Sequence, residues 1–502
     1  MSSKFYITTP IYYVNDVPHI GHAYTSLACD FIARFKRLDG DDAFFLTGTD
    51  EHGQKIEKTA VAKGIEPKEF VDKMYIPFKE LCSKMNFSNS DFIRTTEERH
   101  VRYVQDIWKQ LVASGDVYMG KYSGWYATRD EAFYSEDEIQ DGKAPTGAPV
   151  EWVEEDSYFF RLSAWQDKLL DFYEQHPEFI GPESRRNEVI SFVKSGLVDL
   201  SVSRTSFSWG IPVPGDERHV IYVWLDALFN YISAVASGQS SLWPCDLHVV
   251  GKDILRFHAV YWPAFLMALS MPLPKRIFAH GWWTNEGQKI SKSLGNVIDP
   301  VALVDQYGLD YIRYFLMREI NFGSDGNYSH QLFVQRVNSE LANNIGNLVH
   351  RVMTFIYNNL DGVIPEKVVI SQEDEVIMSL AYSAIDKVRL HVDKQEISAA
   401  LAIIIELGSA CNIYMEKNAP WRLRKEDIDR MNAVLVTLSE CIRVIGILLQ
   451  PVVPGSAAKI LGIFNITEEQ QFEKIHEMKV RLQGVSGINI QKPSVIFSRL
   501  EV

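Results

Sequence analysis

Cysteine is scarce in this chain, and no two cysteines have the spacing of metal ligands. The 502 residues contain five of them: Cys29, Cys82, Cys245, Cys411 and Cys441. Scattered thiols of this kind suit a reducing compartment and argue against a structural zinc site. We therefore expect a cytoplasmic protein without a structural metal.

Long apolar runs and an excess of positive charge are also missing. No window of 18 or more residues is both free of charge and uniformly apolar, so no membrane span is expected. The first residues run directly into a strand pattern, without the signature of a signal or transit peptide. Lysine and arginine total 51 against 65 acidic residues, for a net charge of −14. This balance argues weakly against a nucleic-acid partner unless a basic face forms locally.

The first part of the chain alternates strand and helix patterns. Lys4 to Thr8 reads as a strand, apolar residues recur at helical spacing from Ile20 to Phe35, and Ala43 to Leu46 reads as a short buried strand. Such alternation predicts a doubly wound parallel sheet, in which ligands bind beyond the carboxyl ends of the strands. The turns at Pro18–His22 and Gly48–Gly53 would both lie at that edge.

The length predicts two to four domains, and changes in composition suggest where they divide. Near Gly115 the chain becomes rich in aromatic and acidic residues, and strand–helix patterns resume near Val220. After Gln331 the pattern is almost entirely helical. The expected fold is α/β, a Rossmann-like doubly wound sheet split by an insertion domain and followed by an α-helical bundle. The expected divisions are 1–114 and 211–281 for the sheet domain, 115–210 for the insertion, 282–330 for a loop region, 331–480 for the bundle and 481–502 for a tail.

Two distant segments carry complementary chemistry. Pro18–His22 reads Pro-His-Ile-Gly-His where a strand turns into a helix, and Lys289–Ser293 reads Lys-Ile-Ser-Lys-Ser in a polar loop. The first offers imidazoles and a small residue at a helix N-terminus, and a helix N-terminus favours the binding of phosphate. The second offers mobile cations that can close over a triphosphate. Alone, the first is equally a capped helix, and the second is more often a solvated basic turn. The two together indicate attack on the α-phosphate of ATP.

These segments resemble the HIGH and KMSKS signatures of class I aminoacyl-tRNA synthetases, with Ile290 where methionine is common. The resemblance covers essentially the whole chain and is greatest to bacterial-type methionyl-tRNA synthetases. The blocks that carry it are Thr8–Asn15, Thr47–Gly53, Tyr222–Ala227, Gly251–Ile254 and Asn418–Trp421. It implies an enzyme that ligates L-methionine to its tRNA through a methionyl-adenylate, with release of pyrophosphate.

The resemblance also assigns residues to ATP. His19 and His22 would stabilise the triphosphate in the transition state, and Lys289 and Lys292 would clamp it. Gly21 would allow close approach of the nucleotide, while Gly251 and Asp253 would contact adenosine. Magnesium is expected as the companion of ATP, although no dedicated cage of carboxylates is visible in the sequence.

The methionine pocket is implied in the same way. Asp50 would hold the substrate ammonium in a charge-assisted contact. The remaining lining would be aromatic and aliphatic, as suits a polarisable thioether: Ile11, Tyr13, Trp224, Ala227, Leu228, Tyr231, Ile254, Phe257 and His258. Taken singly, each aromatic side chain here is more readily a core residue, and only membership in the resembling blocks points to a pocket.

The insertion departs from many members of the resembled family. Those members often carry a zinc knuckle with Cys-x-x-Cys pairs, but this chain has Ala127–Asp130 and Ala144–Gly147 in the corresponding places. Without thiolates, a tetrahedral zinc site is not expected. We predict instead a metal-free knuckle held by packing of Trp125, Tyr126, Phe133 and Tyr134.

The helical region is expected to read the tRNA. Trp421 would stack on an anticodon base, and Asn347 and Arg351, four residues apart on one helical face, would offer donors to base edges. Without the resemblance, a helix-capping tryptophan and an exposed polar pair would be the simpler reading. No further tRNA-binding or dimerisation domain is apparent before Val502, so a monomer is expected.

Other classes of protein must be weighed against this interpretation of the sequence. A cysteine-specific synthetase would be expected to bind a thiolate through a metal, and no Cys/His cluster is present. The valine, isoleucine and leucine enzymes need a large editing domain, for which the insertion is too short. Another nucleotidyltransferase would lack the helical bundle. A non-catalytic tRNA-binding relative would be expected to have lost Asp50, His22 or Lys292, all of which are present.

Overall fold

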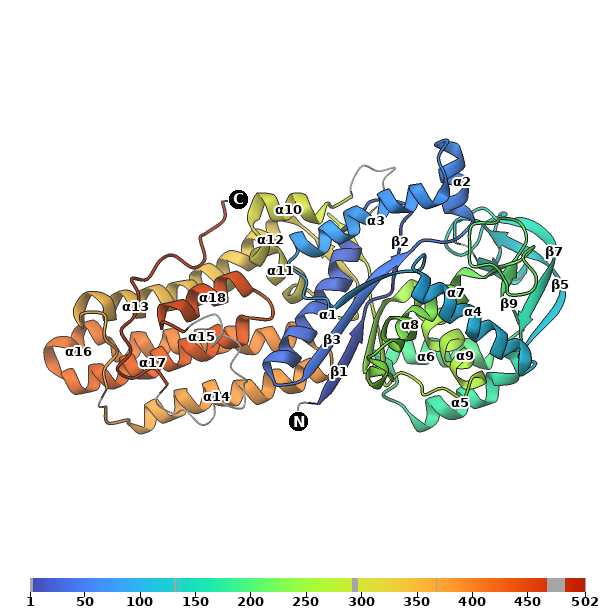
Figure 1. The fold of residues 1–502 in the computed structure, drawn as a ribbon. Helices are drawn as coiled ribbons and strands as arrows, with labels where there is room; N and C mark the ends of the chain where they lie inside the picture. Colours follow the sequence, from blue (N-terminus) through green and yellow to red (C-terminus); the bar gives the residue numbers. More distant parts are fainter. Residues whose placement is uncertain are drawn as a thin grey trace.

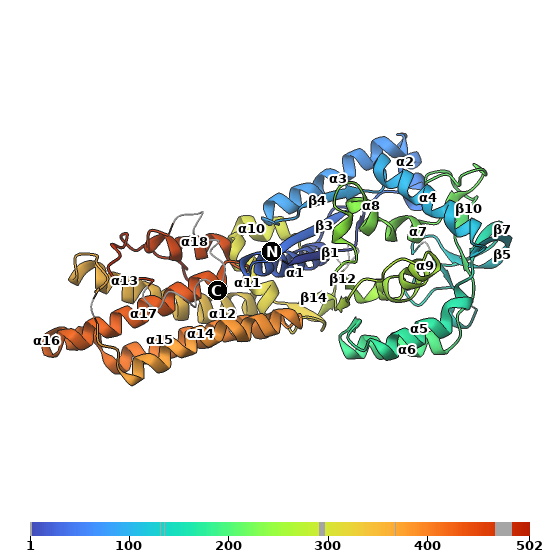
Figure 2. The same ribbon diagram turned by 60° about the horizontal axis from the view of Figure 1, so that its bottom comes forward.

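The chain forms an elongated molecule with a parallel sheet near its middle (Figures 1 and 2). A helical bundle extends to one side of this sheet, and an antiparallel sheet with its own helices lies at the other end. The computed structural model describes residues 3–130, 132–134, 136–290, 297–366, 368–466 and 484–501.

The central sheet has the order β2-β3-β1-β12-β13-β8, with β4 also paired to β3, and every pairing in it is parallel. Its strands are β1 (Lys4–Thr8), β2 (Tyr12–Tyr13), β3 (Asp42–Asp50), β4 (Asp91–Arg94), β8 (Ile180–Gly181), β12 (Leu247–Gly251) and β13 (Ile277–His280). β3 is longer than the expected Ala43–Leu46, because Thr47 to Asp50 continue to pair with β2 and β4. The predicted α/β class is confirmed.

Helix α1 (Ile20–Leu38) anchors this sheet because its apolar positions all face the core. Leu27, Phe31 and Phe35 are at most 1% exposed, and the helix packs on β1, β3 and β12. The other helices around the sheet are α2 (Gln54–Ala62), α3 (Pro67–Lys84), α4 (Glu98–Ala113), α7 (Val223–Leu228), α8 (Asn230–Ala236) and α9 (Trp262–Ala268).

The stretch expected as an insertion contains a four-stranded antiparallel sheet of order β6-β5-β7-β9. Its strands are β5 (Val117–Ala127), β6 (Ala132–Tyr134), β7 (Glu151–Phe160) and β9 (Leu200–Ser201), and α5 (Gln166–Gln175) and α6 (Glu183–Lys194) belong to the same stretch. The stretch also supplies β8, which pairs with β13 at the edge of the central sheet. The apolar run from Val220 does not join that sheet, because β11 (Val220–Ile221) pairs antiparallel with β10 (Ser203–Arg204).

A small sheet leads from the central sheet toward the bundle. It has the order β15-β14-β16, formed by β14 (Trp283–Asn285), β15 (Gln288–Lys289) and β16 (Gly326–Tyr328), and it is accompanied by α10 (Pro300–Tyr307) and α11 (Leu309–Arg318). The bundle consists of α12 (His330–Arg336), a π-helical segment Val337–Gly346, α13 (Asn347–Asn359), α14 (Gln372–Asp393), α15 (Ile397–Asn418), α16 (Pro420–Glu426), α17 (Ile428–Leu449) and α18 (Pro454–Ile463).

Two stretches of the bundle, Ile397–Glu426 and Ile428–Leu449, are long and apolar enough to cross a membrane by length and composition alone. Their most apolar windows are 56% and 94% buried inside the molecule. Packing between helices therefore accounts for their apolar character, since the central helices of a bundle must be apolar on most sides.

Candidate active site

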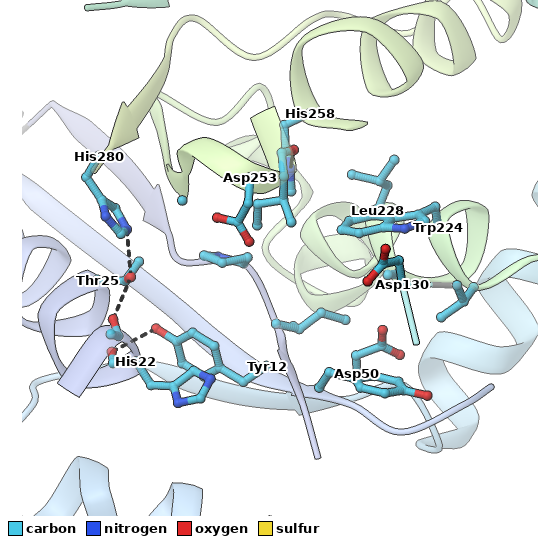
Figure 3. A pocket seen from close by; sticks show the side chains of 18 of the residues that line it. Tyr12, His22, Thr25, Asp50, Asp130, Trp224, Leu228, Asp253, His258 and His280 are labelled. Atoms are coloured by element: carbon cyan, nitrogen blue, oxygen red, sulfur yellow. Dashed lines mark hydrogen bonds between the residues drawn. The ribbon is translucent and has the colours of Figure 1, made fainter. Parts of the chain in front are cut away.

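A cavity of about 430 Å³ opens at the carboxyl edge of the central sheet, where the sequence predicted a ligand site. In Figure 3, His22 on α1 lies at one side, Trp224 and Leu228 at the other, and Asp253 and His258 between them. The cavity brings together most of the predicted ATP and methionine residues: Ile11, Tyr13, His19, Gly21, His22, Asp50, Trp224, Ala227, Leu228, Tyr231, Gly251, Asp253, Ile254 and His258.

The two histidines cap the N-terminus of α1 reciprocally. The backbone N–H of Gly21 donates to His19 Nδ1 at 3.1 Å, and the backbone N–H of His19 donates to His22 Nδ1 at 3.1 Å. Because each Nδ1 accepts a hydrogen bond, a neutral ring must carry its proton on Nε2. The two Nε2–H groups are therefore the donors that this helix end can offer to a ligand.

Desolvation favours the neutral form of both rings. It lowers the pKa of His19, against a smaller opposing effect of Asp253, and places the pKa of His22 well below its ordinary value, helped by the neighbouring His19. The rings lie 4.0 Å apart between centroids. Gly21 is required here, because a Cβ at this position would approach His19 Cε1 to 2.9 Å.

The opposite end of the cavity is apolar with a few polar groups. Asp50, at the end of β3, is 8% exposed. His258 Nδ1 lies 3.0 Å from the carbonyl of Ile254, which can only accept, so His258 Nε2 accepts from the Tyr231 hydroxyl at 2.7 Å. Burial lowers the pKa of His258 to about 4. The neutral ring and the phenol thus fix each other's orientation.

Phe257 does not line this cavity. Its ring stacks on Trp224 with a centroid separation of 3.8 Å and an interplanar angle of 4°, and it lines a neighbouring cavity of about 300 Å³. The sequence predicted that Ile254, Phe257 and His258 share one helical face. Instead the chain forms a short 3₁₀ turn at Lys252–Ile254 and a π-helical turn at Phe257–Tyr261, so α-helical spacing does not apply there.

Asp253 and Trp282 together form the wall of the cavity next to α1, and the sequence did not reveal Trp282 as a partner of Asp253. Trp282 Nε1 donates to Asp253 Oδ1 at 3.2 Å. Lys252 Nζ lies 4.4 Å from the Trp282 ring centroid and 2.7 Å from both carboxylate oxygens of Asp325. A Cβ on Gly251 would lie 2.5 Å from Asp253 Oδ1. Trp282 lies two residues after the end of β13.

The insertion also reaches the cavity through Arg129 and Asp130, which the sequence did not indicate. Asp130 accepts from Arg129 Nε at 3.1 Å, from the Tyr134 hydroxyl at 3.1 Å and from Thr146. Within the described parts of the chain, no group of three or more His, Cys, Asp or Glu residues is placed to hold a metal ion.

The proposed packing of this knuckle is seen in part. Trp125 meets Trp152 edge to face at 5.3 Å, and Tyr126 is 4% exposed. The side chain of Phe133 lies outside what the structure describes. A zinc-free knuckle stays a prediction, which metal analysis of the purified protein tests: one tightly bound zinc per chain would contradict it.

The second signature falls largely outside the described residues. Lys289 ends β15, which pairs with β14, but its side chain and all of residues 291–296, including Lys292, are not described. Their roles as cations stay predictions.

The three residues expected to read an anticodon cluster on the bundle. The Arg351 guanidinium lies 5.5 Å from the Trp421 ring centroid, and its Nη1 lies 2.6 Å from Glu416 Oε1. Trp421 is 43% exposed, and Asn347 is exposed one helical turn before Arg351. Helices α13 and α16, which carry them, lie at the end of the molecule away from the insertion (Figure 1).

Comparison with known families defines the class. The family model described as "tRNA synthetases class I (M)" matches residues 5–148 and 143–353. The model described as "Anticodon binding domain of methionyl tRNA ligase" matches residues 364–501. The chain is thus a class I tRNA synthetase whose helical bundle matches an anticodon-binding domain.

Individual proteins narrow this class. The methionine–tRNA ligase of Rickettsia felis is 57% identical over 100% of this chain and 99% of its own length. That of Brucella suis is 51% identical over 99% and 98%. The structure of Mycobacterium tuberculosis methionyl-tRNA synthetase in complex with methionyl-adenylate superposes with a TM-score of 0.95 at 45% identity, covering 99% of this chain and 100% of that one. The chain belongs to the methionine–tRNA ligase family.

Proposed function

We propose that this chain activates L-methionine with ATP in the cavity at the sheet edge and transfers the methionyl group to a tRNA held by the helical bundle. In the first step a methionine carboxylate oxygen attacks the α-phosphorus of ATP. A new O–P bond forms, the bond to the β-phosphate oxygen breaks, and pyrophosphate leaves. In the second step a ribose hydroxyl at the tRNA 3′ end displaces AMP from the adenylate carbonyl.

The Asp50 end of the cavity receives methionine. The carboxylate of Asp50 pairs with the substrate ammonium, while Trp224, Ala227 and Leu228 contact the side chain. Sulfur–aromatic contacts of this kind stabilise a bound thioether by about 0.3–1.5 kcal/mol each. Because burial keeps His258 neutral, the Tyr231–His258 pair presents dipoles rather than a charge to an uncharged side chain.

The α1 end receives the phosphates. With each Nδ1 occupied by a backbone N–H, the Nε2–H groups of His19 and His22 donate to phosphate oxygens as charge develops on them. The N-terminus of α1 adds its own field. Lys289 and Lys292 close over the pyrophosphate, and Asp253 and Gly251 hold the adenosine. Magnesium comes with ATP, neutralising its phosphates; none of the described residues forms a cage for it.

The bundle selects the tRNA. Trp421 is an exposed aromatic platform on which an unstacked anticodon base packs, and Arg351 and Asn347 offer donors beside it. The partners are thus L-methionine, ATP and the methionine tRNAs, both initiator and elongator. We propose a monomer that acts in the cytoplasm.

One observation carries this proposal above all: the single cavity that joins the Asp50–Trp224 end to the histidine-capped end of α1. The test is ATP–pyrophosphate exchange measured with each amino acid in turn. Methionine should support exchange far better than any other amino acid. If another amino acid supports it better, the assignment of the pocket to methionine is wrong.

A further inference from the structure

A buried carboxylate lies directly behind the wall of the cavity. Asp226 belongs to α7, is 0% exposed, and is not among the residues that line the cavity. Its neighbours on the same helix, Trp224, Ala227 and Leu228, do line it. Successive residues of a helix are rotated by about 100°, so α7 presents the wall on one side and Asp226 on another.

Two histidines from different elements bind this carboxylate. His52 Nδ1 lies 2.6 Å from Oδ2, and His100 Nε2 lies 2.7 Å from Oδ1. An ionised carboxylate only accepts hydrogen bonds, so both nitrogens carry protons and donate them. The other ring nitrogen of His100, which lies on α4, is hydrogen-bonded to the Ser233 hydroxyl, 2.8 Å from Nδ1. All of these residues are at most 6% exposed.

The balance of charges supports an ionised carboxylate at neutral pH. Burial alone would raise the pKa of Asp226, but the electrostatic attraction to His52 and the hydrogen bonds from both histidines outweigh burial, and the net pKa is lowered. In a low-dielectric interior such charge-assisted hydrogen bonds are strong and directional.

His52 follows Asp50 by two residues, so the contact reaches the other wall of the cavity. The turn that carries both is anchored to Trp209. The backbone N–H of Gly53 donates to the carbonyl of Trp209 at 3.0 Å, and Trp209 Nε1 donates to the carbonyl of Glu51 at 2.6 Å. The Trp209 ring also meets His52 edge to face at 5.5 Å. A displacement of α7 relative to this turn would therefore break the contacts of Asp226.

We propose that Asp226 is a positioning residue for methionine, which holds the Trp224–Leu228 wall at a fixed separation from Asp50 through His52 and against α4 through His100. This inference rests on the assignment of the pocket to methionine. Asp226 touches no substrate; it sets the width of the space in which the methionine side chain and ammonium must both be satisfied. The site of the phosphates, on α1, lies outside its contacts.

The variant Asp226→Asn tests this role. An amide has one acceptor oxygen and one donor group, so it satisfies one histidine and turns N–H toward the other. The KM for methionine in exchange should rise by about tenfold, the effect of losing one hydrogen bond to a charged group, while the KM for ATP stays within about twofold. The matched control is Glu440→Gln, which disrupts a buried ion pair with Arg443 in the bundle. The control should leave the KM for methionine unchanged.

The KM values of these variants can overturn the proposal. An unchanged KM for methionine in Asp226→Asn, or parallel rises in both KM values that Glu440→Gln reproduces, overturns the proposal. If Asp226→Asn does not fold, Ser233→Ala decides: it removes only the hydroxyl behind His100 and should raise the KM for methionine by about two- to threefold, and no rise overturns the proposal. Wild-type enzyme without methionine-dependent exchange would instead contradict the proposed function itself.

Discussion

Several histidines with lowered pKa values line or adjoin the cavity, and their protonation makes the stability of the protein depend on pH. Burial lowers the pKa of His258 to about 4 and lowers those of His19, His22, His248 and His280. In the unfolded chain a histidine titrates near pH 6.5. Between pH 6.5 and the lowered value the unfolded state binds more protons, so the free energy of unfolding falls as the pH falls.

We therefore predict that acidification from pH 7 to pH 4.5 destabilises the protein. His258 alone lowers the free energy of unfolding by about 3 kcal/mol once the pH reaches about 4. Carboxylates with lowered pKa values act only below about pH 4. Urea denaturation at a series of pH values measures this, and His258→Gln should make the decline shallower. A flat profile between pH 7 and pH 4.5 would contradict the neutral state of these rings.

Gly21 is the residue on which the histidine cap depends. In Gly21→Ala the new Cβ displaces the His19 ring and with it the cap hydrogen bond. The free energy of unfolding should fall by about 1 kcal/mol, and kcat for exchange should fall more than the KM for methionine rises. The matched control is Gly462→Ala in α18, where a Cβ meets nothing within 4 Å; it should be neutral or slightly stabilising. Equal effects of both variants would contradict the role of the cap.

At the scale of elements, a buried ion pair ties α1 to the bundle. Arg313 on α11 donates to Asp30 of α1 at 2.6 Å, and both side chains are 0% exposed. The same guanidinium donates to the carbonyls of Pro451 and Val452, between α17 and α18, at 2.8 and 2.9 Å. Its Nη1 also donates to the carbonyls of Met85 at 2.9 Å and Asn86 at 3.5 Å. One arginine therefore joins three elements that are far apart in sequence.

Breaking this pair should be costly. Asp30→Asn leaves the Arg313 charge buried without a counter-charge, and we expect a loss of about 3–5 kcal/mol in the free energy of unfolding. Glu69→Gln is the matched control, because it breaks an exposed pair with Lys73 whose side chains are 52% and 63% exposed. That control should change stability by no more than about 0.5 kcal/mol. Comparable losses in the two variants, measured by urea denaturation, would argue against the tie.

Elements with a local period were predictable, and those defined by distant partners were not. The recurrence of apolar residues in α1 and the run in β1 indicated the sheet domain, and the residues at the turn after β1 were found in the cavity. Strand β8 has only Ile180 and Gly181, too few to show alternation, and joins the sheet only because β13 lies beside it.

The π-helical turn at Phe257 changes which residues face the cavity without any signal in the composition. Asp226 could not be distinguished from an exposed helix acid until α4 and the turn after β3 were placed against it.

At the scale of the whole molecule, the proposed sites of activation and of tRNA selection lie in opposite parts of the fold (Figure 1). Trp421→Ala should therefore raise the KM for tRNA by about tenfold, since stacking of one base contributes about 1–3 kcal/mol, and should leave ATP–pyrophosphate exchange intact. Ile413→Ala is the matched control: Ile413 is 70% exposed on the neighbouring helix α15 and should affect neither reaction. Equal losses of exchange and charging in Trp421→Ala would place this residue outside tRNA recognition.

The most direct measurement of the whole account is ATP-dependent charging of a tRNA that carries the anticodon CAU, complementary to the methionine codon. The account predicts that methionine becomes esterified to the 3′ end of this tRNA, and that changing the anticodon lowers kcat/KM for charging by at least about a hundredfold without affecting exchange. Absence of charging, or preferential attachment of a different amino acid, would contradict it.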